Sequence, residues 1–171
     1  MNPLVVVMGV SGSGKSTLGV QLAQSLGVDF VEGDAYHPPR NVERMAAGIP
    51  LTDADREGWL RTLADRIAQA QAAGQGLVVS CSALKRSYRD LLRGAAPLRF
   101  VMPHASRDVL HARMAARTGH YMPASLLDSQ LATLEMPTSD ERVIVVDATA
   151  PVEQTVAALR PQLSRNESEP R

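Results

Sequence analysis

The chain has 171 residues, a length typical of one domain. Its 18 basic and 18 acidic residues cancel, so the overall charge gives no reason to expect a nucleic acid or an anionic membrane as partner. The one cysteine, Cys81, excludes an internal disulfide, and no apolar stretch approaches the roughly 20 residues needed to cross a bilayer. These features predict a globular, cytoplasmic protein.

Short apolar, β-branched runs recur along the chain between segments with helical periodicity. We predict strands at 4–8, about 28–32, 77–80, 98–102 and 143–147. Helices are expected from the first glycine loop to Leu26, over about 54–73 with Thr52 or Asp53 as its cap, from Ser106 to a break at 118–123, over about 124–134, and from Pro151 to Leu163. Strands that alternate with helices are typical of parallel sheets. The sequence therefore predicts a three-layer α/β/α sandwich with a five-stranded parallel sheet, in one domain over 1–163 with insertions after the second and fourth strands, followed by a flexible tail at 164–171.

A phosphate-binding motif follows the first predicted strand. Residues 9–16 read Gly-Val-Ser-Gly-Ser-Gly-Lys-Ser and match the pattern G-x-x-x-x-G-K-[ST]. Glycines let backbone N–H groups converge on phosphate oxygens, and the N-terminus of the following helix adds a favourable dipole. Lys15 is expected to reach the β- and γ-phosphates of ATP, and the Ser16 hydroxyl to bind Mg²⁺. The nucleotide-binding residues expected here are Gly9, Ser11, Gly12, Ser13, Gly14, Lys15, Ser16 and Thr17.

Polar residues that follow the later strands are candidates for an acceptor site, because ligands of an open parallel sheet gather beyond the carboxyl ends of its strands. Asp34 could orient an attacking hydroxyl group or hold a magnesium-bound water. His37 could bond a hydroxyl group, and Arg40 could bind a carboxylate through two parallel hydrogen bonds. Lys85 and Arg89 are four residues apart, so on a helix they would share a face and attract an anionic acceptor.

Arg113 and Arg117 repeat the four-residue spacing just before a break that contains Gly119. A lid over about 113–125 could bring both arginines over the triphosphate, neutralise charge on the transferring phosphoryl group and exclude water. We therefore expect both to bind the nucleotide, and Arg117 to join Lys15 and Asp34 as a catalytic residue.

Three further positions have mainly structural interpretations. Cys81 has no activating partner in the sequence and is expected to be a small buried hydrophobic residue. Trp59 belongs to the apolar row of the helix at 54–73 and is expected to face the core. The segment 147–151 fits two interpretations equally well, a loop flanking the adenine or an ordinary turn capped by Asp147 or Thr149.

Several motifs together resemble those of small gluconate kinases. They are residues 9–16, Gly33-Asp34-x-x-His37-Pro38, Cys81-Ser82-Ala83-Leu84-Lys85-x-x-Tyr88-Arg89-Asp90, Arg117-x-Gly119-His120, and the segment 127–137. The resemblance covers nearly everything from Val5 to Val156. It implies a fold like that of nucleoside monophosphate kinases, a homodimer, and the phosphorylation of D-gluconate, a sugar acid, by ATP to give 6-phosphogluconate.

Two other functions stay open at this point. A kinase of similar fold could act on another small hydroxy acid such as shikimate, because charge alone does not distinguish two hydroxylated carboxylates. A non-catalytic ATP-binding module would need no acceptor site. The clustering of Asp34, Arg40, Lys85 and Arg117 after the second and third strands and in the expected lid argues against such a module.

Overall fold

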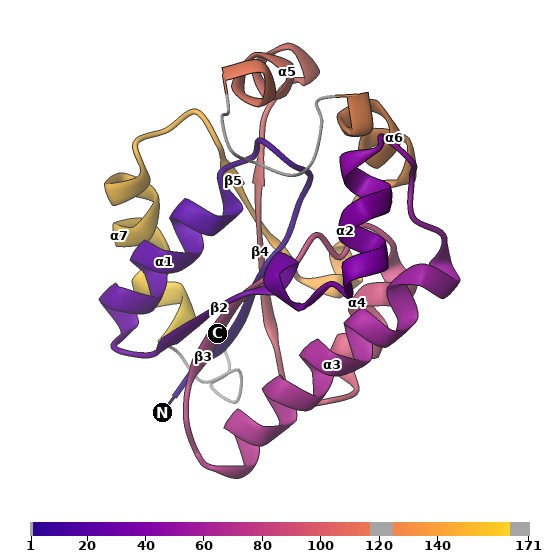
Figure 1. Ribbon diagram of the computed structural model, residues 1–171. Coiled ribbons are helices and arrows are strands. Elements are labelled where there is room, and N and C mark those ends of the chain that lie inside the picture. The colour runs from indigo at the N-terminus through magenta and orange to yellow at the C-terminus, as the bar shows by residue number, and fades with distance from the viewer. Residues whose placement is uncertain (1, 117–124, 165–171) are drawn as a thin grey trace.

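The sheet lies at the centre of the molecule. The computed structural model describes residues 2–116 and 125–164. Their five strands are parallel and lie in the order β2-β3-β1-β4-β5 (Figure 1). They are β1 (Leu4–Val7), β2 (Asp29–Glu32), β3 (Leu77–Ser80), β4 (Arg99–His104) and β5 (Ile144–Asp147). The predicted parallel sheet is confirmed.

Helices cover both faces of the sheet, which confirms the three-layer prediction. On one face lie α1 (Lys15–Leu26) and α7 (Val152–Leu163), side by side in Figure 1. On the other face lie α3 (Asp53–Ala72) and α4 (Arg86–Arg93). Three shorter helices lie toward the end of the molecule at which the strands finish: α2 (Pro39–Ala46), α5 (Arg107–Ala116) and α6 (Ser125–Thr133) (Figure 1).

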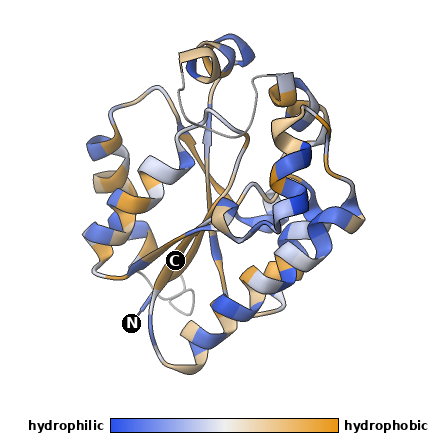
Figure 2. Ribbon diagram, viewed as in Figure 1, coloured by the Kyte–Doolittle hydropathy of each residue, from blue (hydrophilic) through white to orange (hydrophobic). Residues whose placement is uncertain are grey.

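Strand β1 shows how the apolar sequence produces these layers. Alternate side chains of a strand point to opposite faces of the sheet. Leu4 and Val6 accordingly pack with α3 and α4, whereas Val5 and Val7 pack with α1 and α7. A strand that is buried on both sides reads as a continuous apolar run. The central strands β1 and β3, which are buried along their whole length, are accordingly hydrophobic in Figure 2, while the helices carry hydrophilic residues as well.

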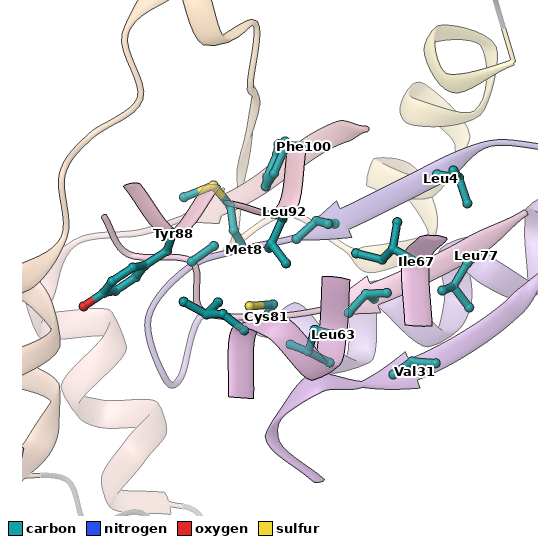
Figure 3. Packing of buried hydrophobic residues seen from close by; sticks show 14 of the residues in the cluster. Leu4, Met8, Val31, Leu63, Ile67, Leu77, Cys81, Tyr88, Leu92 and Phe100 are labelled. Atoms are coloured by element: carbon teal, nitrogen blue, oxygen red, sulfur yellow. The ribbon is translucent and has the colours of Figure 1, made fainter. Parts of the chain in front are cut away.

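The core beneath α3 and α4 reaches the end of the sheet where the polar loops begin. Figure 3 shows Leu63 of α3 and Leu92 of α4 over residues of β1 and β3. Tyr88 lies at the edge of this cluster, with its hydroxyl group directed away from it (Figure 3). The core thus fixes one end of Tyr88 and leaves its polar end for contacts outside the cluster.

Local signals explain the end of α1 and the start of α3. Gly27 ends α1 in the left-handed conformation, with a φ of 69°. Thr52 begins α3 through a capping box with Asp55, as predicted for one of two candidate caps. Helix α2 was not predicted, because it is short and mostly polar and buries only Asn41 and Met45.

Part of the sequence prediction lies outside the described residues. Helix α5 ends at Ala116 and α6 begins at Ser125, so Arg117, Gly119 and His120 of the expected lid are not described. The expected tail is described only at Ser164. Within the described ranges, no helix is both long and apolar enough to span a membrane.

Candidate active site

The phosphate-binding loop joins β1 to α1 and depends on glycine. Gly12 and Gly14 both have a φ of +83°, a conformation that side chains disfavour. A Cβ atom on Gly12 would also lie 3.0 Å from the carbonyl oxygen of Leu110. The Ser13 hydroxyl donates to the carbonyl oxygen of Val10 at 2.7 Å and closes the loop on itself. The loop leads directly into the N-terminus of α1, where the helix dipole favours phosphate.

A cavity of about 400 Å³, which we call the larger cavity, opens beside this loop. Its lining includes Gly12, Ser13, Gly14, Thr17, Arg113, Asp147 and Ala148. Its volume is in the range of pockets for small molecules and cofactors. Arg113 joins its two walls, because its guanidinium group donates to the carbonyl oxygens of Gly12 at 3.4 Å and of Ala148 at 2.7 Å.

The segment at 147–151 forms the capped turn of one interpretation, and its place beside the adenine stays a prediction. The Asp147 carboxylate accepts hydrogen bonds from the Thr149 backbone N–H at 2.8 Å and from its hydroxyl at 2.6 Å. These bonds form a capped turn and lower the pKa of Asp147. The same turn contributes Asp147, Ala148 and Ala150 to the wall of the larger cavity.

A smaller cavity, of about 20 Å³, also lies against the phosphate-binding loop. Its lining combines the apolar residues Met45, Leu51 and Leu84 with Ser11, Lys15, Asp34, His37, Arg56, Trp59, Ser82 and Gln130. Gln130 connects α6 to the loop, since its Oε1 accepts from the Ser11 backbone N–H at 2.7 Å. Lys15 is 8% exposed. The loop therefore contributes Gly12–Gly14 to the larger cavity, and Ser11 and Lys15 to the smaller one.

Asp34 is positioned by the peptide groups just before it. A Cβ atom on Gly33 would lie 2.0 Å from the carbonyl oxygen of Ser80, so only glycine fits so close to β3. The Gly33 N–H donates to the Ser80 hydroxyl at 3.2 Å, and its carbonyl oxygen accepts from the Trp59 indole N–H at 2.8 Å. The backbone at Gly33 is therefore held from both sides, which directs Asp34 to the smaller cavity.

His37 stacks on Trp59, with ring centroids 4.0 Å apart and 17° between the ring planes. Trp59 is 2% exposed, so its predicted burial is confirmed. Burial, helped by the positive charge of Arg56 and opposed by the Asp34 carboxylate, lowers the pKa of His37 to about 4. His37 is therefore neutral near pH 7.

Arg56 was missed by the sequence analysis, although it lines the smaller cavity. It lies three residues before Trp59 on α3, so that both occupy one side of the helix. Its Nη1 donates to the Tyr88 hydroxyl at 3.1 Å, and the same hydroxyl bonds to the Asp53 carboxylate. The three-residue spacing from Trp59 on the predicted helix at 54–73 was the available signal.

Known proteins resemble this chain in sequence over most of its length. Residues 4–137 match a family described as an AAA domain. The gluconokinase of Gluconobacter oxydans (strain 621H) is 57% identical over 143 residues, which cover 83% of this chain and 80% of that protein. The thermoresistant gluconokinase of Escherichia coli (strain K12) is 44% identical over 157 residues, covering 91% of this chain and 90% of that protein. The chain belongs to the gluconokinase family.

Solved structures agree with this assignment to the gluconokinase family. A gluconokinase from Sinorhizobium meliloti 1021 has a TM-score of 0.83 and 50% identity, over 94% of this chain and 93% of that one. A sugar kinase from Janibacter sp. HTCC2649 has a TM-score of 0.90 and 47% identity, over 96% of both chains. A shikimate kinase from Bacteroides thetaiotaomicron, at 20% identity and a TM-score of 0.69, over 95% of this chain and 99% of that one, shares the fold. The predicted family and fold class are confirmed.

Arg40 and Lys85 were expected at the acceptor site, but neither residue lines the smaller cavity. Arg40 is exposed at the start of α2 and is not part of the lining of the smaller cavity. Lys85 precedes α4 and binds the Asp53 carboxylate at 2.9 Å, an interaction that raises the pKa of Lys85. The role of Lys85 as an acceptor ligand stays a prediction.

Arg89 requires a correction, because it is wholly buried and cannot reach a ligand in this conformation. Its guanidinium group binds both carboxylate oxygens of Glu141, at 2.7 and 3.0 Å, and donates to the carbonyl oxygens of Ala83, Leu84 and Glu135. The expectation that Lys85 and Arg89 share a helical face is also wrong, because α4 begins only at Arg86. Arg89 instead fastens α4 to the segment before β5.

Few residues of the gluconokinase site are suited to hold a metal ion by themselves. No group of three or more His, Cys, Asp or Glu side chains is arranged for metal binding within 2–116 and 125–164. Mg²⁺ generally takes one or two protein ligands together with phosphate oxygens and water. The half-buried Ser16 hydroxyl in the first turn of α1 fits that pattern. Cys81 is buried, which raises its pKa to about 12 and makes it unsuited as a ligand or nucleophile.

Proposed function

We propose that this protein transfers the γ-phosphoryl group of ATP to a hydroxyl group of D-gluconate and releases ADP and 6-phosphogluconate. The observation that carries this proposal is the contribution of the phosphate-binding loop to both cavities. A triphosphate that follows the loop from the larger cavity would end beside Lys15 and Asp34. Membership of the gluconokinase family supports gluconate as the acceptor.

The described side chains suggest how the reaction proceeds. The acceptor hydroxyl oxygen would attack the γ-phosphorus as the bond to ADP breaks, and its proton would pass to the Asp34 carboxylate. Phosphoryl transfer depends mainly on positioning and on neutralising charge. Lys15 would neutralise charge at the γ-phosphate, and Arg113 would fix the nucleotide. Ser16 would hold Mg²⁺, which when bound supplies further positive charge to the phosphates.

Arg56 is the cation that we assign to the acceptor carboxylate, in place of Arg40. It lines the same cavity as Asp34, and its bond to Tyr88 fixes one edge of the guanidinium group. A planar guanidinium group can bind a carboxylate through parallel hydrogen bonds. The smaller cavity holds about 20 Å³, roughly the volume of one water molecule, so gluconate would bind to a more open conformation than the one described.

The Arg56→Ala substitution should raise the KM for gluconate roughly 10- to 100-fold, because a hydrogen bond to a charged group contributes about 1.5–3 kcal/mol. The KM for ATP should stay nearly unchanged. Steady-state kinetics with each substrate varied in turn checks this. Arg40→Ala is the matched control and should have little effect on either KM. If Arg40→Ala raises the gluconate KM more than Arg56→Ala does, Arg40 and not Arg56 binds the acceptor carboxylate.

The function itself is tested by ADP release from Mg·ATP across a panel of gluconate, neutral sugars, shikimate and nucleoside monophosphates. Strong stimulation by gluconate alone is the expected result. Stimulation by shikimate instead would preserve the kinase chemistry and overturn the acceptor. ATP binding without stimulation by any compound would favour a non-catalytic ATP-binding module.

Further parts of the proposal rest on the family resemblance. We propose a homodimer in the cytoplasm, the use of Mg²⁺ with ATP, and a lid around Arg117 that adds positive charge over the triphosphate. Arg113 supports the last point, because it lies at the end of α5 from which such a lid would extend. Gel filtration with light scattering tests the dimer.

A further inference from the structure

Asn41 is a polar residue of α2 with no exposed surface. Its Nδ2 donates to the backbone carbonyl oxygen of Asp55 at 2.9 Å and lies 3.2 Å from Nδ1 of His37. Its Oδ1 is buried and has no hydrogen-bond partner among the described residues. A buried oxygen without a partner is unfavourable for stability. The burial of Asn41 at this cost therefore indicates that its amide nitrogen has a role beyond packing.

The carbonyl oxygen of Asp55 determines which way the Asn41 amide faces. A carbonyl group can only accept, so the NH₂ group of Asn41 must lie on that side. Asp55 is itself fixed, because its side chain forms the capping box with Thr52 at the start of α3. The second N–H of Asn41 is then available to Nδ1 of His37, which must present a lone pair.

We propose that Asn41 is a positioning residue that fixes the ring proton of His37 on Nε2, so that His37 offers a hydrogen-bond donor to a hydroxyl group of the acceptor. Nε2 is the remaining polar atom of a ring that lines the smaller cavity. This inference rests on the proposed function, because it needs a hydroxylated acceptor in that cavity.

The surroundings of His37 keep the ring neutral, as this arrangement requires. Trp59 covers one face of the ring. The charged groups around the same cavity are Asp34 after β2, Arg56 on α3 and Lys15 at the start of α1. Burial and the charge of Arg56 together outweigh the Asp34 carboxylate, which leaves the pKa of His37 at about 4. A neutral ring carries one proton, and the contact with Asn41 determines which nitrogen holds it.

The tautomer can be measured directly in the unliganded protein. Nitrogen-15 NMR of the full chain at pH 7, with His37 assigned by its loss in His37→Gln, should show an unprotonated Nδ1 and a protonated Nε2. A proton on Nδ1, or an average over both nitrogens, overturns the proposal. The spectrum needs no acceptor, so its outcome is separate from that of the proposed function.

Kinetics of Asn41→Asp test the consequence for binding. A carboxylate beside Nδ1 draws the proton there and raises the pKa of His37. Below this raised pKa the ring is doubly protonated, still donates from Nε2, and should give a gluconate KM near that of the wild type. Near pH 8.5 the ring keeps only the Nδ1 proton, and the KM should rise roughly tenfold, as expected when one hydrogen bond of about 1.4 kcal/mol is lost.

Two controls separate positioning from a merely structural role. The wild-type KM for gluconate should be flat between pH 6 and 8.5, because His37 is neutral throughout and the acceptor carboxylate is ionised. Asn41→Leu, of similar size, should raise this KM by the same factor at every pH. If Asn41→Asp also shows a pH-independent KM, Asn41 serves the fold and the proposal is wrong. Should Asn41→Asp fail to fold, the NMR result on the wild type decides.

Discussion

Replacement of Asp34 by asparagine is expected to lower kcat by about 10²- to 10⁴-fold, the usual contribution of a group that takes a proton in the transition state. The asparagine side chain would retain the size of the aspartate but could not accept the proton of the acceptor hydroxyl. ATP should bind nearly as in the wild type, because the larger cavity and most of the phosphate-binding loop lie away from this side chain. Coupled measurement of ADP release, together with a nucleotide-binding titration, checks both parts.

The matched control is Asp29→Asn. Asp29 is exposed at the start of β2, the strand that leads to Asp34. It should leave kcat and both KM values close to those of the wild type. A strong loss of ATP affinity in Asp34→Asn, with turnover retained at saturating ATP, would place Asp34 in the binding of the nucleotide and its metal. Full activity of Asp34→Asn would remove Asp34 from the mechanism.

The second large effect concerns stability. Arg89→Met should lower the free energy of unfolding by about 3–5 kcal/mol, because it leaves a buried carboxylate without its main partner. The two side chains of the Arg89–Glu141 pair are 0% and 1% exposed. Since total stabilities are typically about 5–15 kcal/mol, this loss should be plain in urea unfolding at pH 7. The KM for gluconate of the folded fraction should not change.

Arg86→Met provides the control for Arg89→Met. Arg86 binds Asp140, the neighbour of Glu141, but these two side chains are 46% and 60% exposed. Exposed pairs contribute little to stability, so the urea midpoint should hardly move. The double variant Arg89→Met/Glu141→Met should recover part of the loss, because it leaves no buried charge unpaired. A stable Arg89→Met variant with a raised gluconate KM would instead restore Arg89 to the acceptor site.

The same pair predicts a dependence on pH. Hydrogen bonds from Arg89, and secondarily from Arg93, lower the pKa of Glu141 to about 2. The folded state therefore binds this proton less readily than the unfolded chain does. The stability contributed by Glu141 is complete above about pH 4.5 and is lost as the pH falls toward 2. Glu141→Gln lacks this carboxylate. Its free energy of unfolding, measured at several pH values, should therefore depend less on pH over that interval.

Features encoded locally were predicted well from the sequence. The continuous apolar run at Leu4–Val7 predicts a strand buried on both faces, and the glycine pattern after it predicts a phosphate-binding loop. Each depends on residues that are neighbours in the chain. The same holds for the Thr52 cap, whose partner lies three residues away.

Contacts between distant segments were the part that the sequence did not predict. Arg89 was predicted to attract an anionic acceptor because of its spacing from Lys85, but its partner Glu141 is 52 residues away and its environment is the protein interior. Arg40 and Arg56 both follow the second predicted strand, and the sequence does not show which of them lines the acceptor site. Only the packing of α3 against the turn after β2 decides which of them lines the smaller cavity.

The larger cavity joins parts of the chain that are made at very different times. One wall comes from the loop between β1 and α1, and the other from the turn between β5 and α7. During synthesis the phosphate-binding loop leaves the ribosome early, yet it has no complete nucleotide site until β5 has docked beside β4 and α7 beside α1. Bound ATP then favours the docked state, by about 2.7 kcal/mol when its concentration is 100 times its Kd. Binding of ATP would therefore also stabilise the contact between the two chain segments.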